Sequence, residues 1–260
     1  MITWAEFKRE IEKEAPDSTR YRLFKPDGSS RLLYRGQSDS RWSLETTLER
    51  SGHGSISLLR YMQMCGSAYR FLGNISASKV DYDPNAEING ESTRLGFPNY
   101  EYAGYLRHHG FPSPLMDWSE SPFVAAFFAF RRIPSDAESV RVYAYQAETG
   151  VGRSGGTNTP RIESLGPFAS IHERHTVQQS SYTWCYKVDG NDVVTILPHE
   201  EGIEAAKTIC RGQQDRIISW DITASDREVA LADLFRMNIT PFSLFRTVDS
   251  AAETAAMRII

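Results

Sequence analysis

The feature that most constrains the fold of this chain is an apolar run at 123–130, in which every residue is Phe, Ala or Val. Ser121 and Pro122 come directly before it. Serine is a preferred N-cap residue and proline is favoured at the first helical position, so the pair predicts that a helix begins here. A helix that is apolar on every side is buried. We therefore expect this helix to lie in the interior.

The rest of the pattern predicts a single α+β domain over 1–260. Alternating apolar residues predict strands mainly in the second half. Thr3 with Glu6, and Ser225 with Glu228, have the spacing of helix capping boxes. The polar stretch at about 74–99 predicts a long loop or insertion. Expected helices cover 3–14, 43–50, 55–72, 100–108, 201–210 and 225–236, with short turns after 240 and 249. Expected strands cover 31–34, 139–146, 181–188, 193–197 and 215–220.

Composition narrows the class of protein. A chain with 40% hydrophobic residues and 24% charged residues can fill a core and is not disordered in composition. The net charge of −4 argues against indiscriminate binding to nucleic acids or anionic membranes. Cys65, Cys185 and Cys210 are widely spaced, which predicts free thiols in a reducing compartment. No segment has the length of a membrane span and the first residues read as a helix start, so we expect a cytoplasmic protein.

The first candidate motif is an Arg-Gly pair at the end of the strand expected at 31–34. Arg35 leaves that strand with its guanidinium able to enter a cleft, and Gly36 allows a ligand or loop to approach the backbone. A guanidinium binds phosphate or carboxylate through two parallel hydrogen bonds. The alternative is that Arg35 is tied to a buried carboxylate, of which Asp117 is the first candidate.

The second candidate motif is the segment from His108 to Ser119. Neighbouring residues on a helix point about 100° apart, so His108 and His109 cannot bind one metal ion from that helix. We expect one of them to enter the cleft for hydrogen bonding or proton transfer, and the other to be structural. An unpaired buried carboxylate is costly, so Asp117 should be paired. Trp118 is either core or a wall on which a flat ring stacks.

The third candidate motif contains two neighbouring glutamines, Gln178 and Gln179, before an expected strand. Their amides can hold a ligand amide or a base edge, or they can bind the neighbouring loop. Glu120 and Glu173 are the carboxylates near these motifs in sequence. Either is a candidate base, or a partner for a ribose hydroxyl.

These segments resemble the FRG domain family, which is named for a Phe/Tyr-Arg-Gly motif. Arg107, Pro114 and Ser180 depart from residues that are common in the family, which has Gln, Arg and Gly there. The loss of an arginine at 114 removes any phosphate contact that this position makes in relatives. The resemblance rests on Tyr34 to Ser38 with Trp42, Leu44, Leu48 and Arg50; on 108–119 with Ser121, Pro122, Ala125, Phe128 and Ala129; on Arg174, Gln178, Gln179, Tyr182 and Thr183; and on 231–245.

A weaker resemblance to ADP-ribosyltransferases covers two of the three motifs of that superfamily. It implies a mixed β core flanked by helices, NAD as the cofactor without a metal, and a transferase or NAD hydrolase acting as a toxin or phage-defence effector. The third motif normally ends in a catalytic glutamate, which Gln178 and Gln179 do not offer. The implied catalytic residues are Arg35, His109, Glu120, Glu173 and Gln178. The implied NAD-binding residues are Tyr34, Arg35, Gly36, Gln37, His108, Asp117, Trp118, Ser119, Gln179 and Tyr182.

Within that resemblance, Arg35 holds the pyrophosphate and Gln178 orients the acceptor, which is a protein, RNA or DNA. His109 or Ser119 contacts the ribose or the nicotinamide amide. Trp118 or Tyr182 stacks on the ring, and Glu120 or Glu173 supplies the carboxylate. Two alternatives remain open: an enzyme acting on RNA or DNA through the histidines and Arg35, and a non-catalytic interaction module that docks a partner at 74–99.

Overall fold

The computed structural model describes residues 1–14, 32–72, 80–94, 96–148, 156, 158–165, 173–209 and 214–259. Its strands form one eight-stranded sheet in the order β2-β7-β6-β3-β1-β4-β8, with β5 paired to β6. All pairings between these strands are antiparallel, and Ile2 adds one parallel bridge to Ile222 of β8, so the α+β class is confirmed. The strands are β1 Leu32–Gln37, β2 Ile56–Ser57, β3 Met116–Ser119, β4 Ser139–Glu148, β5 Arg161–Leu165, β6 Ser180–Val188, β7 Val194–Leu197 and β8 Gln214–Thr223.

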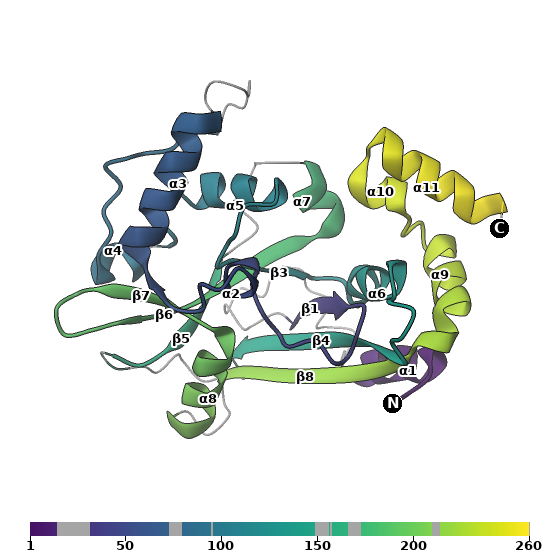
Figure 1. Ribbon diagram of the computed structural model, residues 1–260. Coiled ribbons are helices and arrows are strands. Elements are labelled where there is room, and N and C mark those ends of the chain that lie inside the picture. Colours follow the sequence, from purple (N-terminus) through teal and green to yellow (C-terminus); the bar gives the residue numbers. More distant parts are fainter. Residues whose placement is uncertain are drawn as a thin grey trace, which may run out of the picture.

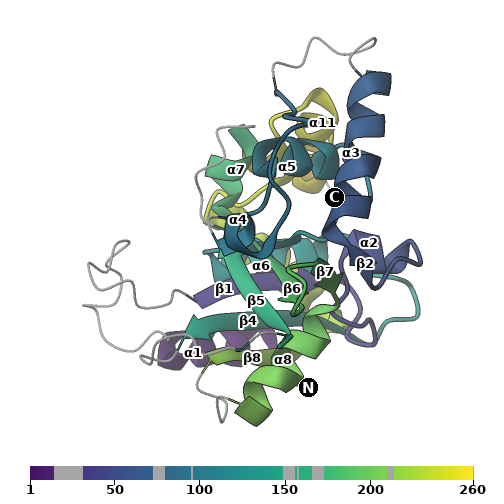
Figure 2. The same cartoon turned by 90° about the vertical axis from the view of Figure 1, so that its left-hand side faces the viewer.

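Helices cover both faces of this sheet (Figures 1 and 2). On one face, α3 and α5 pack over β6 and β7, while α1, α6 and α9 pack over β1, β4 and β8. On the other face, α8 packs over β5, β6 and β8. The helices are α1 Trp4–Glu14, α2 Thr47–Arg50, α3 Leu58–Leu72, α4 Gly90–Arg94, α5 Tyr100–His108, α6 Pro122–Arg131, α7 Glu173–Gln178, α8 His199–Ile209, α9 Arg227–Arg236, α10 Pro241–Phe245 and α11 Val248–Ile259.

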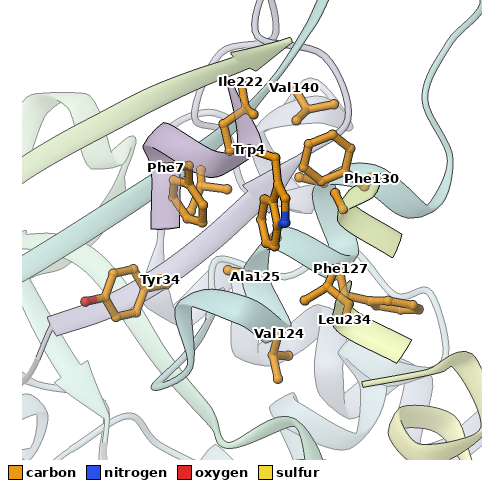
Figure 3. Packing of buried hydrophobic residues seen from close by; sticks show 14 of the residues in the cluster. Trp4, Phe7, Tyr34, Val124, Ala125, Phe127, Phe130, Val140, Ile222 and Leu234 are labelled. Atoms are coloured by element: carbon orange, nitrogen blue, oxygen red, sulfur yellow. The ribbon is translucent and has the colours of Figure 1, made fainter. Parts of the chain in front are cut away.

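The apolar helix α6 lies at the centre of the largest buried cluster (Figure 3). Its start is as predicted, because the Ser121 hydroxyl accepts a hydrogen bond from the backbone N–H of Val124 at 3.3 Å. Phe127 and Phe130 are fully buried, and the ring of Trp4 from α1 packs edge-on against Phe130. Each apolar face of α6 is thus covered by another element, as its composition requires.

Gly36 explains how β1 and α6 pack so closely. A Cβ atom at this position would lie 1.9 Å from the carbonyl oxygen of Ala125 and 2.7 Å from the backbone nitrogen of Ala129. The glycine therefore makes room for the helix. The close approach to the backbone that the sequence predicts at this glycine is thus made by a helix, and Gly36 also lines the cavity described below.

Several sequence-based boundaries differ from the structure because short elements depend on distant contacts. β1 continues through Gln37, and β3 lies within the segment from His108 to Ser119, where no strand was expected. α9 begins after a 3₁₀ turn at Ala224–Asp226, and the Ser225 hydroxyl pairs with Thr223 rather than capping the helix. The strand β2 lies at the start of the helix expected at 55–72, and the helix α4 lies within the loop expected at 74–99. A full helix, α11, replaces the short turn expected after 249, and the elements β5 and α7 were not expected.

Other predictions are confirmed. Thr3 and Glu6 form the predicted capping box, with the Thr3 backbone N–H donating to Glu6 Oε2 at 2.7 Å. Cys65 and Cys185 are free and buried, whereas Cys210 lies outside the described residues. Within the described ranges, none of the helices combines the length and hydropathy needed to cross a bilayer.

Candidate functional site

β1 and β3 separate at the Arg-Gly motif. The two strands pair at a single position, Tyr34 with Ser119. Beyond that pair, the Arg35 Nη1 group donates to the backbone carbonyl of Asp117 at 2.9 Å and also binds its carboxylate. The predicted Arg35–Asp117 pair is therefore confirmed. In a regular antiparallel ladder, this carbonyl would accept a hydrogen bond from a backbone N–H of the neighbouring strand. Here it accepts one from the Arg35 guanidinium instead.

A second arginine binds the same carboxylate. Arg107 in α5 binds Asp117 Oδ1 through Nη2 and the Thr47 hydroxyl through Nη1, the latter at 3.2 Å. The side chains of Arg35 and Arg107 are only 13% and 12% exposed, whereas that of Asp117 is 48% exposed. Burial opposes ionisation of Asp117, but the charges of Arg107 and Arg35 outweigh it and hold the pKa of Asp117 well below its usual range.

The region carries an excess of positive charge. Arg50 lies near both arginines, and burial together with the charges of Arg35 and Arg107 lowers its pKa. Asp117 pairs directly with Arg35 and Arg107, and the charges of Asp117 and Glu45 both act on Arg50, so two carboxylates face three guanidinium groups. An electropositive hollow of this kind attracts anions.

A cavity of about 300 Å³ opens beside this charged group, between α5 and α7 on one side and α6 and α10 on the other (Figure 1). Its floor is the junction of β1 and β3. The residues that line it are Tyr34, Arg35, Gly36, Thr47, Arg107, His108, Asp117, Trp118, Ser119, Ala125, Phe128, Arg174, Gln178, Ser180, Tyr182 and Phe245.

Two histidines and a tyrosine meet at the α5 side of the cavity. His108 Nε2 lies 2.6 Å from His175 Nε2, which comes from α7. The Tyr182 hydroxyl lies 3.1 Å from the first nitrogen and 3.3 Å from the second. Burial raises the pKa of Tyr182 far above its usual range, so its hydroxyl stays protonated. His108 lines the cavity, and His175 is buried behind it.

Comparison with known proteins identifies part of the chain. The family model described as the FRG domain matches residues 30–138. The chain contains an FRG domain. No curated protein and no solved structure matches the chain. The match includes Arg35, Arg107, His108 and Asp117 but ends before α7, β6 and α10.

The polar residues next to the charged floor of the FRG domain bind other parts of the chain. The Ser119 hydroxyl donates to the Gln178 carbonyl at 2.7 Å and accepts from the Ser121 backbone N–H at 3.1 Å. The Gln178 side chain donates to the Leu244 carbonyl at 2.9 Å. Both residues line the cavity, but these bonds join β3, α7 and α10 to one another.

Trp118 contributes to the cavity wall, but its ring lies in the interior. The ring stacks on Tyr145 with centroids 5.3 Å apart, and Nε1 donates to the Thr183 hydroxyl at 2.8 Å. That hydroxyl also binds His199 Nε2 at 2.8 Å, and burial lowers the pKa of His199 to about 3. Of the two readings left open for Trp118, its contacts favour core.

Other predicted site residues lie away from this cavity. His109 is exposed and packs on Tyr105, facing a separate groove beside α3. Gln37 is buried and donates to the Ser43 carbonyl at 3.0 Å. Gln179 is exposed, in a turn with φ of 49°. Of the two histidines, the geometry thus brings His108 rather than His109 to the cavity.

Glu120 is not among the described residues that line the cavity. The Glu120 backbone N–H binds the Gln179 carbonyl at 2.9 Å, at the outer end of β3. Glu173 begins α7, and its side chain lies outside the described part of the structure. Among the residues described, no cluster of three or more His, Cys, Asp or Glu side chains could hold a metal ion.

The site residues that were missed carried partial signals in the sequence. Arg107 stood out as a departure from the family pattern, and Arg174 and His175 lie within the third segment. None of the three entered the predicted site, because their convergence depends on how α5 and α7 pack against β6. Phe245, from α10, ends the segment 231–245 that resembles the family, but its distance in sequence from the rest of the cavity gave no reason to place it there.

Proposed function

We propose that this FRG domain binds NAD in the cavity beside Arg35 and Arg107, and that it transfers ADP-ribose to an acceptor or hydrolyses NAD. The observation that supports this proposal best is the convergence of Arg35, Arg107 and Asp117 from three elements at the floor of one cavity. Buried, oriented guanidinium groups suit a phosphate-bearing ligand, because their hydrogen-bonding geometry is fixed before binding.

The size of the cavity favours one half of the dinucleotide. A volume of about 300 Å³ is at the small end of ligand pockets. In this proposal the nicotinamide ribose half enters the cavity and the pyrophosphate lies at the arginines. Arg174 lines the same cavity from α7 and adds a positive charge on a second side.

Asp117 is the best-placed carboxylate for the reaction. Breaking the glycosidic bond develops positive charge on the ribose, and a nearby carboxylate stabilises that charge. Both arginines hydrogen-bond Oδ1, and the side chain remains 48% exposed at the cavity. In the proposal, Oδ2 faces the ribose. In this proposal Asp117 thus supplies the carboxylate that was expected from Glu120 or Glu173.

The deciding experiment is to incubate the protein with labelled NAD in a cell lysate. We expect NAD to raise the thermal unfolding temperature and to be consumed, with label appearing in protein, RNA, DNA or free ADP-ribose. Arg35→Lys keeps the positive charge but loses the two parallel hydrogen-bond donors of the guanidinium, so it should abolish the consumption of NAD. His109→Ala serves as the surface control and should leave the consumption of NAD unchanged. If NAD neither binds nor is consumed, the proposal is wrong.

A toxin or phage-defence role in the cytoplasm is the biological part of this proposal. It predicts that expression of the wild-type chain arrests growth and that Arg35→Lys relieves the arrest. Equal growth with both chains would contradict this part.

A second candidate function is the processing of RNA or DNA. It is favoured by the position of the His108–His175 pair at the cavity that Arg35, Arg107 and Arg174 line, since paired acid–base groups next to a phosphate-binding site suit phosphodiester chemistry. This function predicts binding of labelled single-stranded RNA or DNA that weakens steeply with salt. Salt-independent or undetectable binding would eliminate it.

A further inference from the structure

The spacing of His108 and His175 restricts where their protons can be. An N···N distance of 2.6 Å leaves room for one proton between the two Nε2 atoms. A neutral imidazole carries hydrogen on one nitrogen and a lone pair on the other. One ring therefore donates and its neighbour accepts, so the protonation of each ring depends on that of the other.

We propose that His108 and His175 form a proton-sharing pair that acts as the acid–base group of the cavity. His108 faces the ligand, and His175 is a positioning residue that fixes the tautomer and orientation of His108. This inference rests on the proposed function, since it assigns the proton acceptor for the NAD reaction.

The reaction step balances as follows. The bond between ribose C1′ and the nicotinamide nitrogen breaks, and its electron pair neutralises the departing nicotinamide. The oxygen of water or of an acceptor hydroxyl forms the new bond to C1′. The proton of that oxygen passes to the His108–His175 pair, which then carries a single positive charge shared by the two rings. The pair returns this proton to solvent after the product leaves.

The charged groups around the pair come from several elements. Among the described residues, Arg107 from α5, Arg35 from β1 and Arg174 from α7 line the same cavity, and Asp117 from β3 opposes them. Tyr182 from β6 contacts both rings. The excess of positive charge favours prompt release of the added proton, and Asp117 provides the nearest compensating charge.

The first test is side-chain ¹⁵N NMR of the unliganded protein across a pH titration. We expect His108 and His175 to titrate together with complementary tautomers. His175→Gln should shift the titration of His108, and Tyr182→Phe, which keeps the buried ring, should shift it less. The control is His53→Gln, because His53 is exposed and its Nδ1 atom hydrogen-bonds Ser51. Independent titrations, or a His108 titration unchanged in His175→Gln and Tyr182→Phe, would overturn the inference.

The second test is the pH dependence of NAD consumption. His175→Gln should lower kcat by about 100-fold with little change in KM, and should change the pH profile, because acid–base catalysis is weakened while binding is retained. A wild-type profile and kcat in His175→Gln would also overturn the inference. If the wild-type protein consumes no NAD, the proposed function fails, and the NMR titration still decides whether the pair shares a proton.

Discussion

Arg35 donates to both the backbone carbonyl and the carboxylate of Asp117, at the point where their strands stop pairing. The separation of β1 from β3 would otherwise leave this carbonyl without a partner from the neighbouring strand. The same guanidinium therefore stabilises the opening in the sheet and forms the floor of the cavity. Stability and ligand binding are thus linked through one side chain.

Removal of Arg35 should destabilise the protein markedly. Arg35→Ala leaves Asp117 with Arg107 alone, so we expect a loss of about 2–3 kcal/mol in the free energy of unfolding. Arg132→Ala is the matched control, because Arg132 is 78% exposed and lies 4.0 Å from Glu253, which Arg131 also binds. It should cost less than about 1 kcal/mol. Urea unfolding of both variants measures the difference, and equal losses would contradict the structural role of Arg35.

Gly36→Ala should be among the most damaging small substitutions in the chain. The new Cβ would lie 1.9 Å from a backbone oxygen of α6, so β1 and α6 would have to move apart. We expect a loss of more than about 3 kcal/mol or no folded protein. At Gly54 a Cβ meets only Pro198 Cγ at 3.9 Å, so Gly54→Ala should change stability by less than about 0.5 kcal/mol. The thermal unfolding temperatures of Gly36→Ala and Gly54→Ala, each compared with wild type, test this prediction.

The pH dependence of stability should reveal the depressed pKa of Asp117. In the unfolded chain this carboxyl takes up its proton near its ordinary pKa of about 3.9, whereas in the folded protein Arg107 and Arg35 keep it ionised to lower pH. Its contribution is therefore complete above about pH 4 and is lost as the pH falls further.

The measurement compares wild type with Asp117→Asn at several values from pH 7 to pH 3. The difference between the two isolates Asp117 from other carboxylates with lowered pKa, such as Asp39 and Glu253. Wild type should be the more stable at neutral pH, and its advantage should shrink below about pH 4. A constant difference over the whole range would show that the ion pairs do not depress this pKa.

Cys65 and Cys185 should resist thiol reagents in the folded protein. Burial raises the pKa of Cys65 to about 12 and that of Cys185 still further, so neither forms the reactive thiolate at neutral pH. In a Cys210→Ser variant we expect labelling only under unfolding conditions. Mass spectrometry of the native protein after exposure to a maleimide gives the answer, and rapid labelling of either cysteine would be incompatible with their burial.

The sequence predicted best those features that are local. The Thr3 and Ser121 caps were correct because a cap involves only the next few residues. The Arg35–Asp117 pair was predicted for a different reason, namely that an unpaired buried carboxylate is costly, although the Asp117 side chain proves to be 48% exposed.

The features that the sequence could not predict depend on packing between distant segments. Consecutive histidines point in different directions, so the pattern indicated that one of them enters the cleft but not which one. Tyr102 and Leu106 are buried against other elements and thereby fix the orientation of α5. This orientation brings His108, and not His109, to the cavity. β2 has two residues and α7 has six, too few for periodicity to show.

The cavity is divided between two stretches of the chain. The segment that matches the FRG family, 30–138, supplies Arg35, Arg107 and Asp117, while Arg174, Tyr182 and Phe245 come from later residues. Substitutions after position 138 can therefore reshape the ligand's surroundings and leave the charged floor intact. A chain cut at that point would keep its anion-binding groups but would lack the cavity wall formed by α7, β6 and α10.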